Sequence, residues 1–540
     1  MAVTKNQEYT VTIEGYSGEG AGVARIDGFV VFVSGALRGE VCRVLILKVL
    51  KSAAFAKVLE VLETSPHRIT PDCPYFPRCG GCTYRHMDYA EELALKRRRV
   101  QDNLARIGGS EVEVEEILGA AETRRYRNKA QYPVSPDGRI GFYRARTHEV
   151  IDTRECLLVK PEADAAAEAV RQYMRDFRVA GYDERTGRGL LRHVYVRSNT
   201  KGESLICLLV NGKRLPHEAE LVERLRRACP KAVGIVLGEN TRRDNVILGE
   251  RYRTLWGADR LEDVLCGRVF RLSVPSFYQV NREQAERLYA KAIEYAQLTG
   301  EETVLDLYCG AGTITLALAS HAKRVLGAEI VPEAIDDARE NAARSGVENA
   351  EFFCGDASDV AKKLAQENLR PDVITVDPPR KGLAEDVVES IARMQPERVV
   401  YVSCDSATMA RDVKRFAALG YRAVRACAVD LFPRADHVET VVLLSKGEID
   451  SKKVRVEFSL EDMDMSGFQK GATYEQIKAY VLEHTGLKVS SLYISQIKRK
   501  CGLDVGQNYN LSKKEDAKVP KCPPEKEAAI RDALKYFQMI

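Results

Sequence analysis

Long apolar runs and an excess of charge of one sign are both missing from this sequence of 540 residues. The most apolar stretch near the start, residues 41–50, is interrupted by Arg43 and Lys48, and no signal-peptide-like stretch opens the chain. We therefore expect a soluble, cytoplasmic protein with no membrane partner. The 82 basic and 78 acidic residues leave a net charge of +4, so overall charge does not predict a nucleic-acid partner.

Internal repeats, low-complexity tracts and the usual phosphate-binding loops are missing as well. A chain of this length without repeats is expected to form three or four domains, at least one of them with a large core. The sequence contains neither GxxxxGK[ST] nor a complete GxGxxG. A nucleotide-like cofactor would therefore be one that has no pyrophosphate.

Cysteine, by contrast, is frequent, and three of the 14 cysteines lie in CPYFPRCGGC at residues 73–82. In a reducing cytoplasm such a cluster is more typical of a metal site or of catalysis than of disulfides. The spacing of five and then two residues leaves zinc and iron-sulfur open, because both are held by four thiolates. His86 could complete a zinc site.

The regions before and after the cysteine cluster have different patterns. Residues 1–63 alternate apolar and polar positions, which predicts a small β-barrel of the OB-like kind, with or without an RNA ligand. An α+β central domain is expected at 64–265. A predicted helix within it carries the basic run 96–99, which forms either a phosphate contact or a solvated helix face. Residues 449–540 predict a small, basic helical extension of unknown role. Its second predicted helix carries Lys498, Arg499 and Lys500.

Between residues 266 and 448 the pattern predicts an α/β domain with a parallel sheet, because short apolar runs alternate with helical stretches. Its first strand enters the glycine turn of DLYCGAGT, and later strands end at Glu329, Asp356 and Asp377. The carboxyl ends of parallel strands share one edge, so these residues predict a nucleoside ligand there. S-adenosylmethionine, which lacks a pyrophosphate, fits best.

Cys404 ends the fifth predicted strand at the same edge, among the polar residues of SCDS. A thiolate beside a methyl donor makes chemical sense for a pyrimidine acceptor. Its addition to carbon 6 of uracil creates an enolate that can take a methyl group at carbon 5. A base must then remove the proton on carbon 5, and Glu439 near the start of the last strand is the candidate.

These motifs, in this order, resemble those of the RNA uracil-5-methyltransferases that use S-adenosylmethionine, in particular the iron-sulfur branch that acts on large-subunit ribosomal RNA. The resemblance covers residues 5–446. It rests on SFYQVN (276–281), DLYCGAGT (306–313), DPPRKG (377–382), SCD (403–405) and HVE (437–439).

The resemblance implies an RNA-binding TRAM barrel, a Rossmann-like class I methyltransferase domain, and roles for individual residues. Cys404 would be the nucleophile and Glu439 the base. The implied cofactor contacts are Gln279, Tyr308, Thr313, Glu329, Asp356 and Asp377. The implied ligands of a [4Fe-4S] cluster are Cys73, Cys79, Cys82 and the distant Cys156. Arg127, Asn128 and Lys129 would serve either the RNA or the fold.

The implied activity is the formation of 5-methyluridine in 23S ribosomal RNA by a monomeric enzyme. Three alternatives remain open. The substrate could be transfer RNA, although that branch generally lacks the cysteine cluster. The acceptor could be an amino group, although Arg380 takes the place of the aromatic residue that usually follows DPP in such enzymes. The protein could also be a non-catalytic, RNA-binding ribosome-assembly factor, a reading opposed by the presence of Cys404, Glu439 and Asp377.

Overall fold

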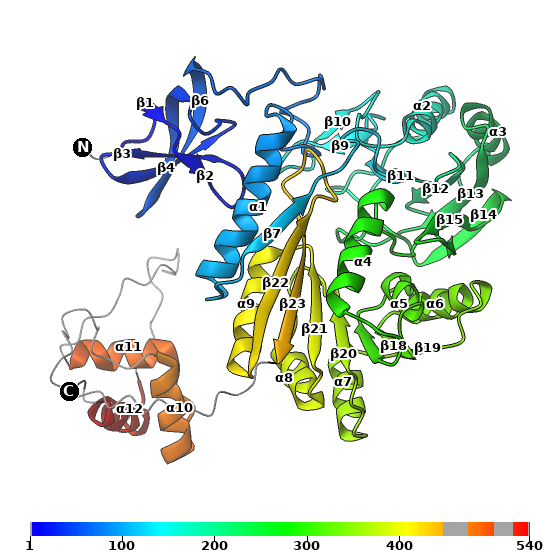
Figure 1. Ribbon diagram of the computed structural model, residues 1–540. Helices are drawn as coiled ribbons and strands as arrows, with labels where there is room; N and C mark the ends of the chain where they lie inside the picture. Colours follow the sequence, from blue (N-terminus) through cyan, green and yellow to red (C-terminus); the bar gives the residue numbers. More distant parts are fainter. Residues whose placement is uncertain (1–2, 447–473, 502–521, 538, 540) are drawn as a thin grey trace. The chain divides into compact units, whose positions relative to one another are not determined.

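The computed structural model describes residues 3–446, 474–501, 522–537 and 539 (Figure 1). The chain divides into two compact units, residues 1–450 and 451–540, and each is described by itself. Within the described ranges, no helix combines the length and the apolar character that crossing a lipid bilayer requires.

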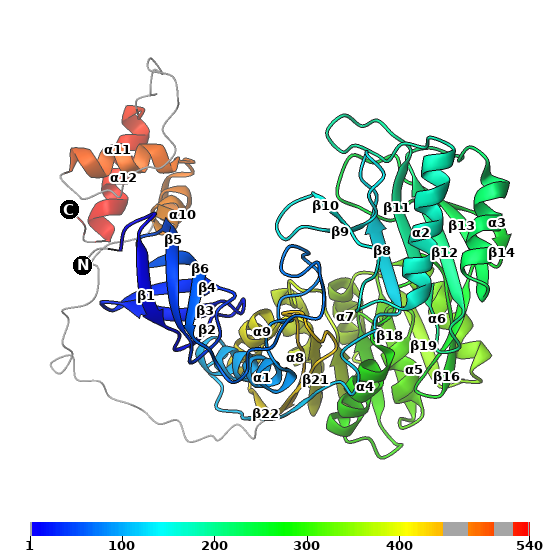
Figure 2. The ribbon, with the colours of Figure 1, turned by 90° about the horizontal axis from the view of Figure 1, so that it is seen from above.

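The first part of the larger unit is a curled sheet of six strands (Figure 2). Alternate residues point to its interior, where Val31, Val33, Val44 and Ile46 are fully buried. This is the two-residue period that predicted the barrel. In sheet order the strands are β1 (Glu8–Thr12), β5 (Val41–Val49), β6 (Ala53–Glu63), β4 (Phe29–Ser34), β3 (Gly22–Ile26) and β2 (Gly15–Tyr16).

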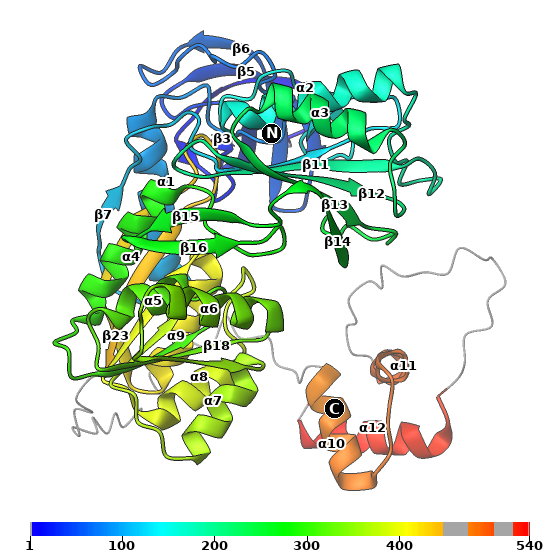
Figure 3. The same ribbon diagram turned by 90° about the vertical axis from the view of Figure 1, so that its right-hand side faces the viewer.

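A second sheet of five strands lies in the predicted central region, and helices α2 (Pro161–Asp176) and α3 (Glu218–Ala228) pack on one of its faces (Figure 3). Its strands, in order, are β14 (Arg251–Gly257), β13 (Ala232–Glu239), β12 (Ser204–Val210), β11 (Leu191–Ser198) and β8 (Lys129–Pro133). The same region contains two small hairpins, β9 (Gly141–Tyr143) with β10 (Val150–Asp152), and β15 (Leu261–Leu265) with β16 (Arg268–Leu272).

The largest sheet has eight strands and helices on both faces, as the predicted α/β domain requires. In order its strands are β19 (Ala350–Cys354), β18 (Arg324–Glu329), β17 (Thr303–Leu307), β20 (Val373–Val376), β21 (Arg398–Ser403), β23 (Glu439–Lys446), β22 (Tyr421–Val429) and β7 (Val114–Leu118). Neighbouring strands from β19 to β21 are parallel, and β23 runs antiparallel to both β21 and β22. The outermost strand, β7, comes from the region predicted as the central domain.

Two hydrophobic cores cover the faces of this sheet. One face packs against α4 (Arg282–Ala296), α5 (Thr313–Ala319) and α6 (Pro332–Arg344). The other face packs against α1 (Tyr89–Arg106), α7 (Ala357–Gln366), α8 (Glu385–Met394) and α9 (Ser406–Ala418). Helix α1 therefore packs on the largest sheet, although its residues lie within the range predicted for the central domain.

The smaller unit contains helices α10 (Tyr474–Thr485), α11 (Ser491–Lys500) and α12 (Pro524–Tyr536), which share an apolar core. Its predicted basic run does not form a continuous exposed patch. Lys498 is 7% exposed, with its ammonium 4.9 Å from the centre of the Tyr474 ring, and Lys500 is ion-paired with Glu527. Arg499 and Lys500 are exposed, so the buried Lys498 interrupts the run.

The basic run of α1 is divided between the interior and the surface: Lys96 is buried, whereas Arg97 and Arg98 are exposed. Lys96 is fully buried, and its ammonium donates to Glu92 (2.8 Å), Asp430 (2.7 Å) and the backbone oxygen of Phe432 (3.1 Å). Both carboxylates are also fully buried. A charge cluster without access to water is stable only while its members compensate one another.

Replacing Lys96 by Met should therefore lower the free energy of unfolding by roughly 3 kcal/mol or more, because two buried carboxylates lose their shared cation. Urea unfolding followed by circular dichroism measures this. Lys363 in α7 is a matched control, since its contact with Glu367 is exposed and 4.0 Å long. Lys363→Met should change the stability by less than about 0.5 kcal/mol. Equal effects of the two substitutions would contradict the assignment.

Candidate active site

The structure brings the two predicted catalytic residues together at the carboxyl edge of the large sheet. Strands β21 and β23 are antiparallel, and their register ends at the pair Ser403 and Thr440. Cys404 follows Ser403 and Glu439 precedes Thr440, so these two residues occupy facing positions one step beyond the last pair of the two strands. Glu439 is 3% exposed and Cys404 is half-buried. A thiol and a carboxyl group from distant parts of the sequence thus form one site.

Burial and mutual repulsion control the protonation of these groups. Burial, with the charges of Glu439 and Asp377, raises the pKa of Cys404 to about 11. Burial and Asp377 raise the pKa of Glu439 to about 8, and burial and Asp306 raise the pKa of Asp377 to about 7. Arg380 acts in the opposite direction on the pKa of both Cys404 and Glu439. At neutral pH the isolated site therefore holds a thiol and a mostly neutral Glu439.

The polar residues around Cys404 make hydrogen bonds that hold its turn. Asp405 caps α9 by accepting from the backbone amides of Ala407 and Thr408, both at 3.0 Å. The Ser403 hydroxyl donates to the backbone oxygen of Asp405. Sequence patterns cannot separate a capping residue from a ligand contact, because both place a polar side chain just after a strand.

Helix α1 also supports this turn. The side-chain amide of Asn103 donates to the hydroxyl of Ser406 at 2.8 Å, and Ser406 is the first residue of α9. Ser406 is 5% exposed. The loop that carries Cys404 is thus fixed by a helix that lies some 300 residues earlier in the chain.

The glycine turn after β17 has the conformation expected of a close backbone approach to a ligand. Gly310 and Gly312 have positive φ angles of 55° and 80°, and the preceding Tyr308 has a φ of 68°. The Glu329 carboxylate accepts from the backbone amide of Gly310 at 3.2 Å. The Thr313 hydroxyl, at the start of α5, lies 3.0 Å from the hydroxyl of a buried tyrosine. Glu329 thus contacts the turn.

The remaining predicted cofactor residues make different contacts within the protein. Asp356 is the N-cap of α7 and accepts from the amide of Ser358 at 2.9 Å. Gln279 is 7% exposed, and its backbone oxygen accepts from the side chain of Asn128 at 2.9 Å. The contact of Asn128 is therefore with the protein itself. Phe277, two residues before Gln279, is 62% exposed, and the sequence interpretation did not single it out although it lies in SFYQVN.

The four predicted cluster ligands, which are distant in the chain, line one cavity of about 240 Å³. These are Cys73, Cys79, Cys82 and Cys156, and all four are free thiols. Among the described residues, no three histidine, cysteine or acidic side chains are grouped so that they could hold a metal ion. His86 does not line the cavity, and its ring stacks on Phe76.

The donor set of this cavity fits an anionic group. Arg85 is 3% exposed, its Nε donates to the sulfur of Cys82 at 3.3 Å, and its Nη1 is ion-paired with Asp72. Its Nη2 has no hydrogen-bond partner in the described structure. Burial and the neighbouring Cys73 and Cys156 raise the pKa of Cys79, so ionised thiols here need a compensating positive charge. A [4Fe-4S] cluster held by these thiolates would place its negative charge beside this guanidinium.

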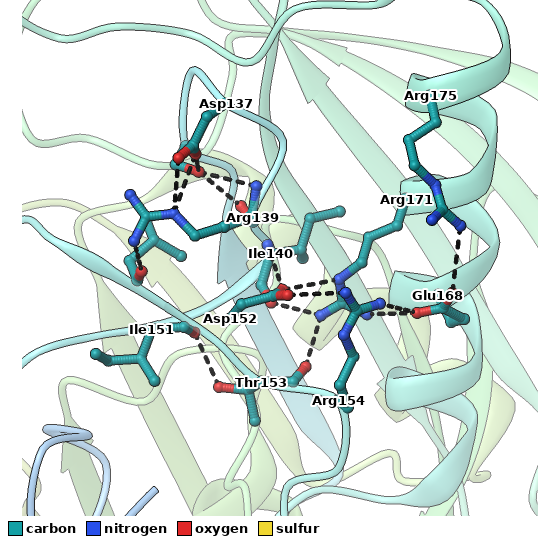
Figure 4. Close-up of polar contacts among 12 residues, drawn as sticks. Asp137, Arg139, Ile140, Ile151, Asp152, Thr153, Arg154, Glu168, Arg171 and Arg175 are labelled. Atoms are coloured by element: carbon teal, nitrogen blue, oxygen red, sulfur yellow. Dashed lines mark hydrogen bonds and ion pairs between the residues drawn. The ribbon is translucent and has the colours of Figure 1, made fainter.

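The segment that carries Cys156 is held from both sides. Arg171 of α2 is 4% exposed and donates to the backbone oxygens of Ile140 and Thr153 and to the carboxylate of Asp152 (Figure 4). The backbone amide of Cys156 donates to the carboxylate of Asp164. These bonds place Cys156 at the cavity independently of any bound group.

Comparison with known proteins gives matches over most of the chain. The family described as tRNA (Uracil-5-)-methyltransferase matches residues 88–447, and the TRAM domain family matches residues 2–59. An uncharacterized RNA methyltransferase of Halalkalibacterium halodurans is 45% identical over 447 residues, which cover 82% of this chain and 98% of that protein. One from Clostridium tetani is 41% identical over 449 residues, with the same shares of the two chains.

A solved structure is similar over the same extent. The tRNA (uracil-54, C5)-methyltransferase of Pyrococcus abyssi, solved in complex with S-adenosyl-L-homocysteine, has a TM-score of 0.66 and 28% sequence identity. The match covers 81% of this chain and 99% of that one. The match to the methyltransferase family ends at residue 447, before the unit that contains α10 to α12.

The electrostatics of the site predict how Cys404 reacts with iodoacetamide. With a pKa of about 11, its alkylation should rise roughly tenfold per pH unit from pH 7 to 10. At pH 9 Glu439 is ionised, so Glu439→Gln should speed alkylation several-fold, whereas Arg380→Gln should slow it.

Peptide mass spectrometry resolves the individual cysteines, and the exposed Cys354 serves as an internal control. Changes in the same direction for both variants, or rapid alkylation of Cys404 at pH 7, would contradict this description.

Proposed function

We propose that this chain, which belongs to the tRNA (uracil-5-)-methyltransferase family, forms 5-methyluridine in 23S ribosomal RNA. It is an RNA methyltransferase whose methyl donor is S-adenosylmethionine. The observation that carries the proposed reaction is the juxtaposition of Cys404 and Glu439 at the ends of β21 and β23. A thiol nucleophile beside a buried carboxyl group suits addition to a pyrimidine followed by removal of a proton.

In the proposed mechanism, Cys404 adds as a thiolate to carbon 6 of the target uracil. Bound S-adenosylmethionine supplies the methyl group that carbon 5 then takes up. Glu439 removes the proton that remains on carbon 5, and the bond between carbon 6 and the sulfur of Cys404 breaks to restore the ring. A carboxyl group with a pKa of about 8 is a stronger base, once ionised, than an ordinary glutamate. Arg380 favours the thiolate that starts the sequence.

The target base has to leave its stack to reach a half-buried thiol. The exposed ring of Phe277 is a candidate surface for that base, because it lies two residues from the cofactor candidate Gln279. The proposed cofactor contacts are Gln279, Tyr308, Thr313, Glu329, Asp356 and Asp377. The Glu329 carboxylate keeps lone pairs for ribose hydroxyls beyond the one that it uses on Gly310.

We also propose that Cys73, Cys79, Cys82 and Cys156 hold a [4Fe-4S] cluster. Their common cavity and the unpaired donor of Arg85 support this. When bound, the cluster supplies negative charge for Arg85 and links chain segments, since methyl transfer requires no electron. The cysteine set also favours ribosomal RNA as the substrate, because it resembles that of the iron-sulfur branch. We propose that the protein acts as a monomer in the cytoplasm.

Transfer RNA is the second candidate substrate, because the matched family is described by it and the Pyrococcus abyssi enzyme acts on it. A non-catalytic assembly factor is less consistent with a nucleophile and a base held on adjacent strands.

A 5-fluorouridine-containing fragment of 23S ribosomal RNA tests the reaction, because fluorine cannot be removed as a proton and the covalent complex accumulates. With S-adenosylmethionine, the wild-type protein should form an adduct that survives denaturing electrophoresis. Cys404→Ala should abolish the adduct, and Cys354→Ala, at an exposed cysteine of β19, should retain it.

A transfer RNA transcript with the same substitution runs in parallel. An adduct with transfer RNA alone would favour the second substrate. The absence of both adduct and methyl transfer on any RNA would favour the assembly factor.

Anaerobic purification tests the cluster. The wild-type protein should be brown, with about four iron atoms per chain, and Cys79→Ala should lose the broad visible absorbance. Cys266→Ala is the control, since Cys266 is exposed and outside the cavity. A colourless protein that contains stoichiometric zinc would overturn the assignment.

A further inference from the structure

The segment between β22 and Glu439 is held to an unusual degree by the rest of the protein. We call residues Asp430–Asp436 the pinned segment, because six of its seven backbone oxygens accept a hydrogen bond from outside the segment. The donors are Gln284 to Asp430 (3.0 Å), Asn281 to Leu431 (3.1 Å), Lys96 to Phe432 (3.1 Å), Tyr126 to Pro433 (3.0 Å), the amides of Thr83 and Tyr84 to Arg434 (2.7 and 3.0 Å), and Arg99 to Asp436.

These donors come from four parts of the protein: the start of α4, helix α1, the central region and the segment that follows Cys82. Connecting segments usually leave many of their carbonyls to water. Here the partners are protein groups that are themselves packed, such as Tyr126 at 7% exposure and Lys96 at 0%. The path of the chain into Glu439 is therefore determined by its surroundings.

The pinned segment also forms part of the wall of the cysteine cavity. Its residues Ala435 and Asp436, with the adjoining His437, line that cavity together with the four thiols. The amide donors Thr83 and Tyr84 directly follow Cys82. In Figure 1 the loop that joins β22 to β23 lies between the large sheet and the hairpin of β9 and β10. The pinned segment thus contacts the cysteine segment directly and leads, three residues later, to Glu439, the base of the proposed reaction.

We propose that the pinned segment positions Glu439 for proton removal, and that the cysteine segment influences the reaction through it. The inference rests on the proposed function and assigns Lys96, Arg99 and Tyr126 as positioning residues. Glu439 begins its strand, so its placement depends on the residues that lead into it as well as on its register with β21. An error of about 1 Å in a reacting group can slow a step by roughly 100-fold.

A positioning defect has a signature that instability lacks. If Glu439 is misplaced, addition and methyl transfer still occur, and the methylated RNA stays bonded to Cys404 because the proton on carbon 5 is not removed. A destabilised protein would lose active molecules without changing the proportion of trapped product. The quantity to measure is the fraction of RNA, carrying radiolabelled methyl from S-adenosylmethionine, that remains attached to the protein under denaturing conditions.

Tyr126→Phe is the mildest test, because it removes one hydrogen bond and retains the ring. With unmodified uridine RNA, we expect turnover to fall about 3- to 10-fold, the trapped fraction to rise, and the KM for RNA to stay unchanged. Tyr173→Phe is a matched control, since the Tyr173 hydroxyl also donates to a proline carbonyl, that of Pro216, away from the site. It should match the wild type in all three measurements.

Arg99→Met provides a second, independent variant, with the exposed Arg106 of the same helix as its control. Glu439→Gln runs beside both as the reference for a missing base. If Glu439→Gln traps methylated RNA but Tyr126→Phe and Arg99→Met do not, the inference is overturned and the proposed function stands. If Glu439→Gln traps no methylated RNA, Glu439 is not the base, and both the inference and that part of the proposed function are wrong.

Hydrogen–deuterium exchange tests the connection to the cysteines without any assay of activity. In the full-length protein purified anaerobically, the backbone amides of residues 430–438 should exchange at least several-fold faster in Cys79→Ala than in the wild type. Cys266→Ala should leave their exchange unchanged. Equal exchange in Cys79→Ala and the wild type would overturn the influence of the cysteine segment on the pinned segment.

Discussion

The buried ammonium of Lys96 is the interaction on which the arrangement of the catalytic region depends. It joins α1 to Asp430, 334 residues later, and its removal would leave two carboxylates in an apolar interior. The same helix connects to the N-terminal sheet, because Glu91 accepts from Tyr16 and Arg38. One helix thus links the RNA-binding type of domain at the start of the chain to the loops that carry the reacting groups.

The chemistry of the site follows from the cost of burying charge. Burial and the charges of Glu439 and Asp377 raise the pKa of Cys404, so the resting site disfavours the thiolate that the reaction needs. A cationic methyl donor bound at this edge would favour that thiolate, in the same direction as Arg380. Reactivity would then coincide with the presence of the donor, and the thiol would remain protected in its absence.

Some of the site was predictable and some was not, for reasons that individual residues illustrate. Cys404 follows β21 and Glu329 ends β18, and both strands belong to the parallel part of the sheet. Glu439 begins the antiparallel strand β23, so all three residues lie at one edge. Asp405, Lys96 and Asn128 were interpreted differently or left open, because capping, buried pairing and backbone support look the same in sequence as ligand contact. For Lys96 and Asn128 the deciding partners, Asp430 and Gln279, lie 334 and 151 residues away.

The sequence by itself determined the alternation of elements, the edge at which the polar residues meet, and the family. These depend on local periodicity and on motif order, which are written along the chain. Only the tertiary structure decided that α1 and β7 complete the catalytic sheet, that four separated cysteines line one cavity, and that six carbonyls before Glu439 are held from outside. Such contacts join residues whose separation in sequence is arbitrary, so no local pattern encodes them.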